Sequence, residues 1–432
     1  MEVSLEERGR RAVLLIGAVA ISAILIFSAG RFWIARHLLE SGQIPQLERS
    51  ASLVPGNGEV WDELGRLHQW DLADADLPLA IADFRRAVDV DSLSAHYWMD
   101  LAGALEASGD DTSARQAFAR AQSVYPKSAE VAFNYGNFLL RHDDPAGGYR
   151  ELRRAAEGDA NFLPLIISRA WRSTEDVDQL LDQALPQNAG AYLQTLDFFR
   201  SIHQAEPALA VWGRLIMLGP HFPLRGSFPL MDELIDEDRS SDARRVWREA
   251  LTAAGLPSAD PPNQSLVWNG NFRMDFANGG LDWRWWPVNG ALMDFDSEPG
   301  PNGSGALRLD FSGGANVGLP VPFQYVPVEP NHTYHFHAYL RTDQITTESG
   351  IRFQVNDPNH PNSLNLITDN FIGSHRWSPV DVNFTTGPQT HFLVIRLVRD
   401  PSKLFDNRLG GTAWVADVSV VPISGSPGQP AS

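Results

Sequence analysis

The chain contains no cysteine, and this absence sets the first limits on its chemistry. Without cysteine there is no disulfide, no thiolate nucleophile and no Cys-ligated metal site. Basic residues are also scarce: 35 Lys and Arg stand against 53 Asp and Glu, which gives a formal net charge of -18. Non-specific nucleic-acid binding needs a basic face that displaces counterions from phosphate, so we expect no nucleic-acid partner.

Catalytic signatures are missing as well. The sequence has no H-E-x-x-H, G-x-S-x-G or P-loop motif, so nothing indicates a metalloprotease, a serine hydrolase or nucleotide-driven chemistry. Glycoside cleavage requires two carboxylates about 5–10 Å apart, and no acidic pair stands out. We therefore predict that the protein is not an enzyme and has no cofactor beyond a possible structural calcium.

One long uncharged apolar run is present, at residues 12–30. About 20 such residues form a helix that can cross a bilayer, so we predict a transmembrane helix at 12–34. Three arginines precede the run and two follow it, which places the N-terminus, 1–11, in the cytoplasm and the bulk of the chain in the periplasm or outside the cell. A cleaved signal peptide is the alternative, since Ser28 and Gly30 suit a cleavage site. A buried soluble helix is a third interpretation.

An internal repeat follows the apolar run. Its clearest copy has large and small residues at helical spacing, namely Trp98, Leu101, Ala102, Leu105, Ala114, Phe118, Ala121 and Pro126. Comparable positions recur at 61–87 and 135–155, and more weakly at 192–250. Small residues let neighbouring helices approach while large ones fill the gaps. This pattern resembles the tetratricopeptide repeat, which has a period of ~34 residues.

The resemblance predicts an all-α tetratricopeptide-like solenoid of five or six units at 44–256. It implies that the first helices of the repeats form a concave surface that binds a protein partner. His68, His96 and Tyr97 are candidates to face that surface. The alternative is a rigid spacer with no partner. The prolines that follow predict a stiff connector at 257–263, the best domain boundary in the chain.

Beyond the connector, short alternating runs are separated by Asn, Gly, Pro and Asp. In residues 333–341, Tyr334, Phe336, Ala338 and Leu340 would share one face of a strand. We therefore predict an all-β sandwich at 264–423, followed by a disordered tail at 424–432.

The sandwich segment also contains an ordered set of short motifs. They are Asn269-Gly270-Asn271-Phe272, Leu281-Asp282-Trp283, Gln324-Tyr325-Val326-Pro327-Val328, Tyr339-Leu340-Arg341-Thr342, Trp377 and Gly411-Thr412-Ala413-Trp414-Val415-Ala416-Asp417-Val418. Together they resemble the jelly-roll carbohydrate-binding modules of cellulases and xylanases. The resemblance implies a concave face that holds a sugar chain and a structural calcium at the edge.

Sugar binding needs aromatic rings that stack on pyranose faces and planar polar groups that bond hydroxyls. The candidate residues are Trp285, Trp286, Tyr325, His335, His337, Tyr339, Arg341, Arg352 and Gln354. Core packing is the alternative for the tryptophans, and a merely solvated strand face is the alternative for the polar residues. Trp283, Trp377 and Trp414 are assigned to the core. For calcium, only Asp417 is nominated, and a single carboxylate predicts a weak or missing site.

The sequence thus predicts a multi-domain chain: a transmembrane helix, a tetratricopeptide-like solenoid and a jelly-roll sandwich. Our hypothesis is a membrane-anchored, non-catalytic scaffold of the cell envelope. Its repeats bind a protein, its sandwich binds a polysaccharide, and it assists glycan assembly or export. The alternative keeps the architecture and makes the sandwich a structural or protein-docking domain without sugar binding.

Overall fold

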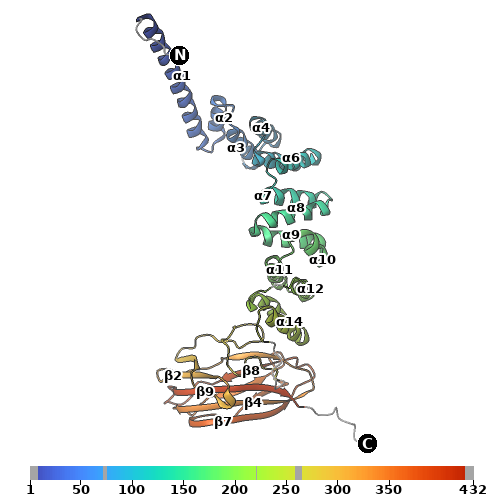
Figure 1. Ribbon diagram of the computed structural model, residues 1–432, viewed down its shortest axis with the longest axis vertical. Helices are drawn as coiled ribbons and strands as arrows, with labels where there is room; N and C mark the ends of the chain where they lie inside the picture. The colour runs from blue at the N-terminus through green and yellow to red at the C-terminus, as the bar shows by residue number, and fades with distance from the viewer. Residues whose placement is uncertain (1–7, 72–74, 220, 258–264, 424–432) are drawn as a thin grey trace. The chain divides into compact units, whose positions relative to one another are not determined.

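A computed structural model describes residues 8–71, 75–219, 221–257 and 265–423. Helices fill the first part of the chain and strands the second (Figure 1). The helices are α1 (Arg8–Leu39), α2 (Ile44–Leu53), α3 (Gly58–Trp70), α4 (Leu77–Val90), α5 (Ala95–Ala107), α6 (Asp111–Val124), α7 (Ala129–Arg141), α8 (Pro145–Gly158), α9 (Leu163–Thr174), α10 (Val177–Gln179), α11 (Ala189–Ser201), α12 (Ala205–Met217), α13 (Phe228–Asp236) and α14 (Ser240–Ala253).

The strands are β1 (Ala291–Asp296), β2 (Ala306–Ser312), β3 (Phe323–Pro327), β4 (Thr333–Ile345), β5 (Arg352–Asn356), β6 (Asn365–Ile367), β7 (Gly373–Thr385), β8 (Phe392–Val398) and β9 (Gly410–Pro422). Helical repeats followed by antiparallel sheets confirm the predicted fold class. The chain forms two compact units, Met1–Gln187 and Asn188–Ser432, so α11–α14 belong with the strands. The predicted connector lies outside the described residues apart from Pro257, and the predicted tail lies wholly outside them.

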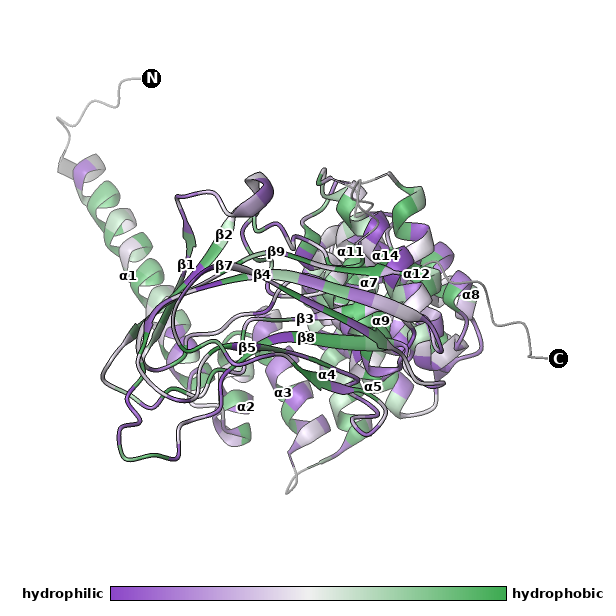
Figure 2. Cartoon of the chain, turned by 90° about the horizontal axis from the view of Figure 1, so that it is seen from below, coloured by the Kyte–Doolittle hydropathy of each residue, from purple (hydrophilic) through white to green (hydrophobic). Residues whose placement is uncertain are grey.

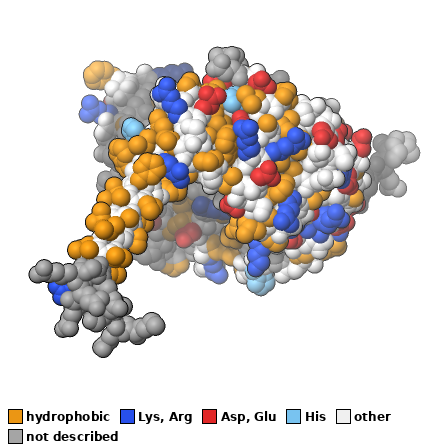
Figure 3. Space-filling model, turned by 90° about the horizontal axis from the view of Figure 1, so that it is seen from above, with side chains coloured by type: hydrophobic (Ala, Val, Ile, Leu, Met, Phe, Trp, Pro, Cys, Tyr) orange, Lys and Arg blue, Asp and Glu red, His pale blue; other side chains and the backbone are white. Residues whose placement is uncertain are grey.

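Helix α1 carries the apolar run. By length and composition, its segment Arg11–Leu39 could cross a membrane, which is weak evidence for a single-pass protein. Most of its residues are hydrophobic (Figure 2), and their side chains are exposed along the helix (Figure 3). The helix continues past the predicted end at residue 34, and Ala35 and Leu39 in its last turns are buried: Ala35 is 2% exposed, and the Ser50 hydroxyl of α2 donates to the Ala35 carbonyl over 2.7 Å. The end of α1 is therefore part of the folded repeat region.

The helix pairs α3–α4, α5–α6 and α7–α8 form the repeats of the first unit. Each of these helices begins with an Asn, Asp or Ser side chain that accepts a backbone N–H of the first turn. Phe84, Phe118 and Phe138 are buried between neighbouring helices. The indoles of Trp61 and Trp98 each donate to the carbonyl six residues earlier, over 3.0 Å. Equivalent positions in successive pairs thus have the same environment, as in a repeat array.

The strands of the second unit form two antiparallel sheets, ordered β1-β2-β9-β4-β7 and β3-β8-β5-β6. Their facing sides enclose one core, to which β4 contributes Tyr334, Phe336, Ala338 and Leu340. The predicted alternation along β4 is confirmed. It arises because successive side chains of a strand point to opposite faces, so one apolar face can be buried while the other remains polar.

Helices α13 and α14 pack against the loops and strands of the same unit. The Arg244 guanidinium donates to the Pro327 carbonyl over 3.0 Å. The rings of Trp247 and Trp268 meet edge to face with centroids 6.2 Å apart. A Cβ added at Gly280 would lie 2.3 Å from the Trp247 ring, so glycine permits this close approach. The last helices and the sandwich therefore share packed side chains.

Candidate functional site

A groove of about 520 Å³ lies on the first helices of the repeats. Helix α5 contributes His96, Met99, Asp100, Gly103, Glu106 and Ala107, and helix α7 contributes Glu130, Phe133, Asn134, Asn137 and Arg141. Steps of three and four residues place each set on one helical face. The groove is therefore a direct product of the repeat pattern, and its lining combines apolar, amide and charged groups.

One end of the groove carries an acidic pair held by an arginine. Arg66 contacts Asp62, and its Nε lies 3.1 Å from Asp100 Oδ2. Burial, assisted by the nearby Asp100, raises the pKa of Asp62 to about 6. Because Arg66 supplies the compensating positive charge, this end of the groove does not present a free acidic pair.

A second ion pair lies in the groove at Glu106. The Arg141 guanidinium donates to both of its carboxylate oxygens, over 2.8 and 2.9 Å, and His142 contacts one of them. Burial acts to raise the pKa of Glu106, but the hydrogen bonds from Arg141 and His142 outweigh it and the pKa is lowered. The paired geometry fixes these side chains as part of the groove wall.

Helix α7 also presents an aromatic ring and an amide to the groove. Phe133 packs against Phe162 with centroids 4.9 Å apart, and Arg169 lies 5.9 Å over its ring. The Asn134 amide nitrogen donates to the Glu130 carbonyl over 3.0 Å. A peptide backbone needs both donors and acceptors, which side-chain amides supply, while Phe133 offers an apolar contact.

Of the three candidates named for this surface, His96 alone lines the groove. His68 is buried and bonds Asp83 of α4 over 2.8 Å. Tyr97 is partly buried and lies against Gly58, where a Cβ would come within 2.7 Å of its ring. Both have packing roles, which helical spacing alone does not distinguish from exposure.

The candidate sugar-binding residues divide between the two sheets. His335, His337, Tyr339 and Arg341 lie on the outer face of β4. Tyr325 on β3 and Arg352 and Gln354 on β5 lie on the outer face of the other sheet. Because the sheets pack face to face, these outer faces point in opposite directions, and the candidates do not form one site.

On the four-stranded sheet, three rings form a row that we call the aromatic row: Trp286, Phe323 and Tyr325. Trp286 meets Phe323 edge to face at 5.8 Å, and Phe323 meets Tyr325 at 5.7 Å. Trp286 is 48% exposed. Trp285, its neighbour, packs against the sandwich core instead, so the two tryptophans take different roles.

The core assignment is wrong for Trp414 and for Trp377. Trp414 is partly exposed on the outer face of β9, and Arg341 stacks 4.2 Å over its ring. Trp377 is also partly exposed, whereas Trp283 is 1% exposed and confirms its assignment. The error at Trp414 has a physical cause, because its alternation partners Ala413 and Val415 are the inward residues of that strand.

Asp417 has a positive φ of 52° and accepts a hydrogen bond from the Asn302 amide over 3.0 Å. It belongs to neither of the two clusters of metal-ligating side chains found within the described residues. Those clusters are His335, His337, Asp381 and Asp62, His96, Asp100. Calcium at Asp417 stays a prediction.

Sequence reasoning did not nominate Asp381 or Asn383, which lie opposite His337 and His335 on β7. The alternation of polar Asp381 and Asn383 with Val380, Val382 and Phe384 is the signal that could have found them. Pairing them with β4, however, requires knowledge of strand order.

Comparison with known proteins supports the repeat region. The tetratricopeptide repeat family model matches residues 95–138. No match is found among curated proteins. Among solved structures, pilF of Pseudomonas aeruginosa is 18% identical, covers 44% of this chain and 91% of its own, and has a TM-score of 0.29. YrrB, described as a TPR protein with an unusual peptide-binding site, is 12% identical over 48% of this chain and 92% of its own, with a TM-score of 0.26.

MamA protein is 15% identical over 46% of this chain and 92% of its own, with a TM-score of 0.24. The repeat assignment is based on the matched segment and on the helix pairs described above.

Proposed function

We propose that this protein is a non-catalytic, membrane-anchored scaffold of the cell envelope. Its repeats bind a protein partner, its sandwich binds a polysaccharide, and the two activities together assist glycan assembly or export. The observation that carries the first part is the groove on α5 and α7, whose lining matches the needs of an extended peptide.

Gly103 offers a direct test of the groove. No atom lies within 4 Å of a Cβ added there, so a large side chain can project into the groove without disturbing the helix. We expect Gly103→Trp to abolish capture of the partner from native membranes while the protein stays folded. Gly213→Trp is the matched control, because Gly213 on α12 has equally open surroundings and is not among the residues that line the groove. Equal capture by both variants would contradict the proposal.

For the polysaccharide we propose the outer face of the four-stranded sheet. The aromatic row offers ring faces to pyranose C–H groups, and Arg352 and Gln354 offer donors on the same face of the sheet, on β5, which β8 separates from β3. Gln354 already donates to Asn365 over 2.7 Å, which orients its amide. Arg284 lies 5.2 Å over the Tyr325 ring and holds that ring in place.

The test is binding of the full-length, detergent-solubilised chain to an array of envelope polysaccharides. We expect Trp286→Ala to weaken binding at least tenfold, which corresponds to the ~1.4 kcal/mol scale of one stacking contact. Trp414→Ala, a tryptophan on the opposite sheet, should leave binding unchanged. The proposal fails if no polysaccharide binds or if Trp286→Ala binds as tightly as the wild type.

The second candidate function makes the sandwich a protein-docking domain. The contacts of α13 and α14 favour it, since Asp232 pairs with Arg284 at 3.1 Å beside the aromatic row. A sandwich that already binds helices through this edge could dock others. A null result on the polysaccharide array, with a protein captured through the same face, would support this alternative.

The proposal also states that the folded units lie on the outer side of the membrane, and this has its own test. Because the native chain has no cysteine, each introduced thiol is unique. Ala119→Cys and Leu292→Cys place thiols on exposed positions of the two units, and Ser4→Cys places one before the apolar run. An impermeant maleimide should label the first two in spheroplasts and label position 4 only after lysis. The reverse pattern would overturn an outward-facing chain.

A further inference from the structure

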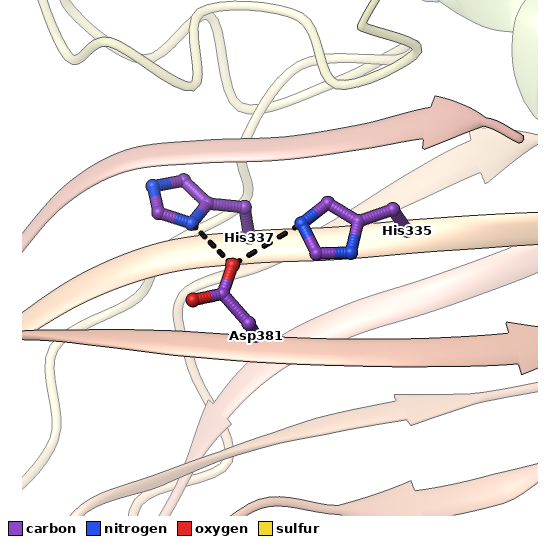
Figure 4. A group of neighbouring side chains, drawn as sticks. All are labelled: His335, His337 and Asp381. Carbon is purple, nitrogen blue, oxygen red and sulfur yellow. Dashed lines mark hydrogen bonds and ion pairs between the residues drawn. The ribbon is translucent and has the colours of Figure 1, made fainter.

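Two histidines and an aspartate converge on the outer face of the five-stranded sheet (Figure 4). We call His335, His337 and Asp381 the His-Asp cluster. His337 Nδ1 lies 2.7 Å and His335 Nε2 lies 3.1 Å from the same carboxylate oxygen, Oδ1 of Asp381. The histidines are two residues apart on β4 and the aspartate faces them from β7, so regular strand pairing holds all three in place.

Asn383 determines how His335 presents its ring. Nδ1 of His335 lies 2.8 Å from Oδ1 of Asn383, and an amide oxygen can only accept, so Nδ1 carries a proton. In the neutral ring Nε2 then presents its lone pair toward Asp381. Two acceptors 3.1 Å apart repel each other unless a cation, either a proton on Nε2 or a metal ion, lies between them. An outer partner that fixes the tautomer in this way is typical of metal-ligating histidines.

The spacing of the donor atoms fits a small divalent ion. All three donors lie within 4.8 Å of one another. Zinc bonds of about 2.0–2.1 Å in a tetrahedron place ligand atoms about 3.3 Å apart, so the two nitrogen–oxygen distances of 2.7 and 3.1 Å need to lengthen by about 0.2–0.6 Å. The rings are partly exposed, with His337 the more buried, and the solvent side is open to a further ligand.

The other cluster within the described residues, Asp62 with His96 and Asp100, differs in one respect. Arg66 contacts both of its carboxylates and supplies the positive charge that a metal would bring. No arginine or lysine ion pair is found to Asp381, whose ion-pair partners within the described residues are the two histidines. An arginine therefore supplies a permanent positive charge in the groove, whereas on β4 and β7 the carboxylate faces two imidazoles that can also act as metal ligands.

We propose that His335, His337 and Asp381 bind a divalent transition-metal ion of the zinc class, with Asn383 orienting His335. Two imidazoles and one carboxylate suit zinc, which prefers nitrogen and oxygen ligands in a tetrahedron, over calcium, which prefers oxygen alone. Three protein ligands leave one position for water or for an oxygen ligand of a molecule that docks on this face. The site lies on the sheet opposite the aromatic row, so it neither requires nor tests the proposed polysaccharide site.

Calorimetric titration of the tag-free, full-length chain with zinc sulfate tests the site by measuring the affinity and stoichiometry of zinc binding. We expect one tightly bound zinc ion per chain, and we expect His335→Gln, His337→Gln and Asp381→Asn each to weaken binding more than tenfold. Asn383→Ala, which removes only the orienting partner, should weaken binding about tenfold to a hundredfold. His375→Gln is the matched control, because it removes an exposed histidine from the same strand, β7, outside the cluster.

A second readout keeps the result independent of folding. Zinc should raise the Tm of the wild-type chain, because a ligand that binds the folded state stabilises it, and should leave the Tm of His337→Gln unchanged. Cobalt should give visible absorption bands that are lost in the same variant. The proposal is overturned if zinc does not bind, if His375→Gln loses as much affinity as His337→Gln, or if His96→Gln removes the bound ion instead.

Discussion

At the scale of single residues, burial of charge is the clearest feature. Asp282 is 2% exposed, and its carboxylate accepts the backbone N–H groups of Ala277 and Trp283 over 2.7 and 2.8 Å. Burial raises its pKa to about 6, and these hydrogen bonds only partly offset that effect. Asp282 therefore orders a loop of the sandwich, and its carboxyl group loses its proton at a higher pH than an exposed aspartate does.

Replacement of Asp282 by Asn should change how stability depends on pH. The folded chain holds this proton more tightly than the unfolded chain, so the carboxyl lowers stability as pH rises from about 4 to 6. One pKa unit corresponds to about 1.4 kcal/mol, which gives about 3 kcal/mol across this window. We expect Asp282→Asn to be less stable than the wild type at pH 4, because it loses an acceptor, and the gap to narrow by pH 7.

Urea unfolding of both proteins at several pH values measures this gap. A gap that stays constant, or that widens toward pH 7, would show that the burial of Asp282 does not control its protonation.

At the same scale, the sequence predicts which face of a strand a side chain occupies better than it predicts which side chains form one site. The alternation along β4 placed Tyr334 and His335 on the correct sides, because period-two alternation is a local property. It could not show that Tyr325 and Tyr339 lie on different sheets. Tyr325 pairs with Val394 and Tyr339 with Ala416, and pairings across such sequence separations are not encoded in local spacing.

At the scale of elements, close packing between helices depends on residues without side chains. A Cβ added at Gly65 on α3 would lie 2.6 Å from the buried ring of Phe84 on α4. Gly103 on α5 faces open space instead. The repeat pattern predicted this contrast in part, since Gly65 occupies the position equivalent to Ala102, where a small residue meets the neighbouring helix.

We expect alanine at these two glycines to have opposite effects. Gly65→Ala should destabilise the chain by about 1–3 kcal/mol, because the fully buried Phe84 ring cannot move aside. Gly103→Ala should stabilise it by about 0.5–1 kcal/mol, because alanine loses less backbone freedom in a helix. Chemical denaturation of the two variants measures both effects, and effects of the same sign would contradict this account of the packing.

At the scale of the whole molecule, the division into units differs from the change of sequence pattern. The pattern changes at the prolines near residue 261, whereas the compact units meet at Gln187 and Asn188. The reason is side-chain contact: Trp247, Arg244 and Asp232 of the last helices bind the loops and strands that follow. Periodicity identifies types of structure, and it does not report which of them pack together.

This grouping predicts how fragments behave. We expect residues 188–432 to unfold as one cooperative unit, and a fragment that begins at 265 to have a lower Tm. Trp247→Ala should destabilise the longer fragment by about 3–5 kcal/mol, as expected for removal of a buried tryptophan. Calorimetry of the three proteins tests this. Equal Tm values would show that the last helices contribute nothing to the stability of the sandwich.

The unbroken course of α1 has a consequence for how the repeats meet a bilayer. The helix runs from Arg8 to Leu39, and Ala35 and Leu39 near its end contact α2. No flexible linker therefore separates the proposed membrane span from the first repeat. Tilt of a spanning helix follows the thickness of the surrounding hydrocarbon and its anchors. In a chain inserted as proposed, lipid composition would therefore set the tilt of α1 and, through it, the orientation of the groove relative to the membrane plane.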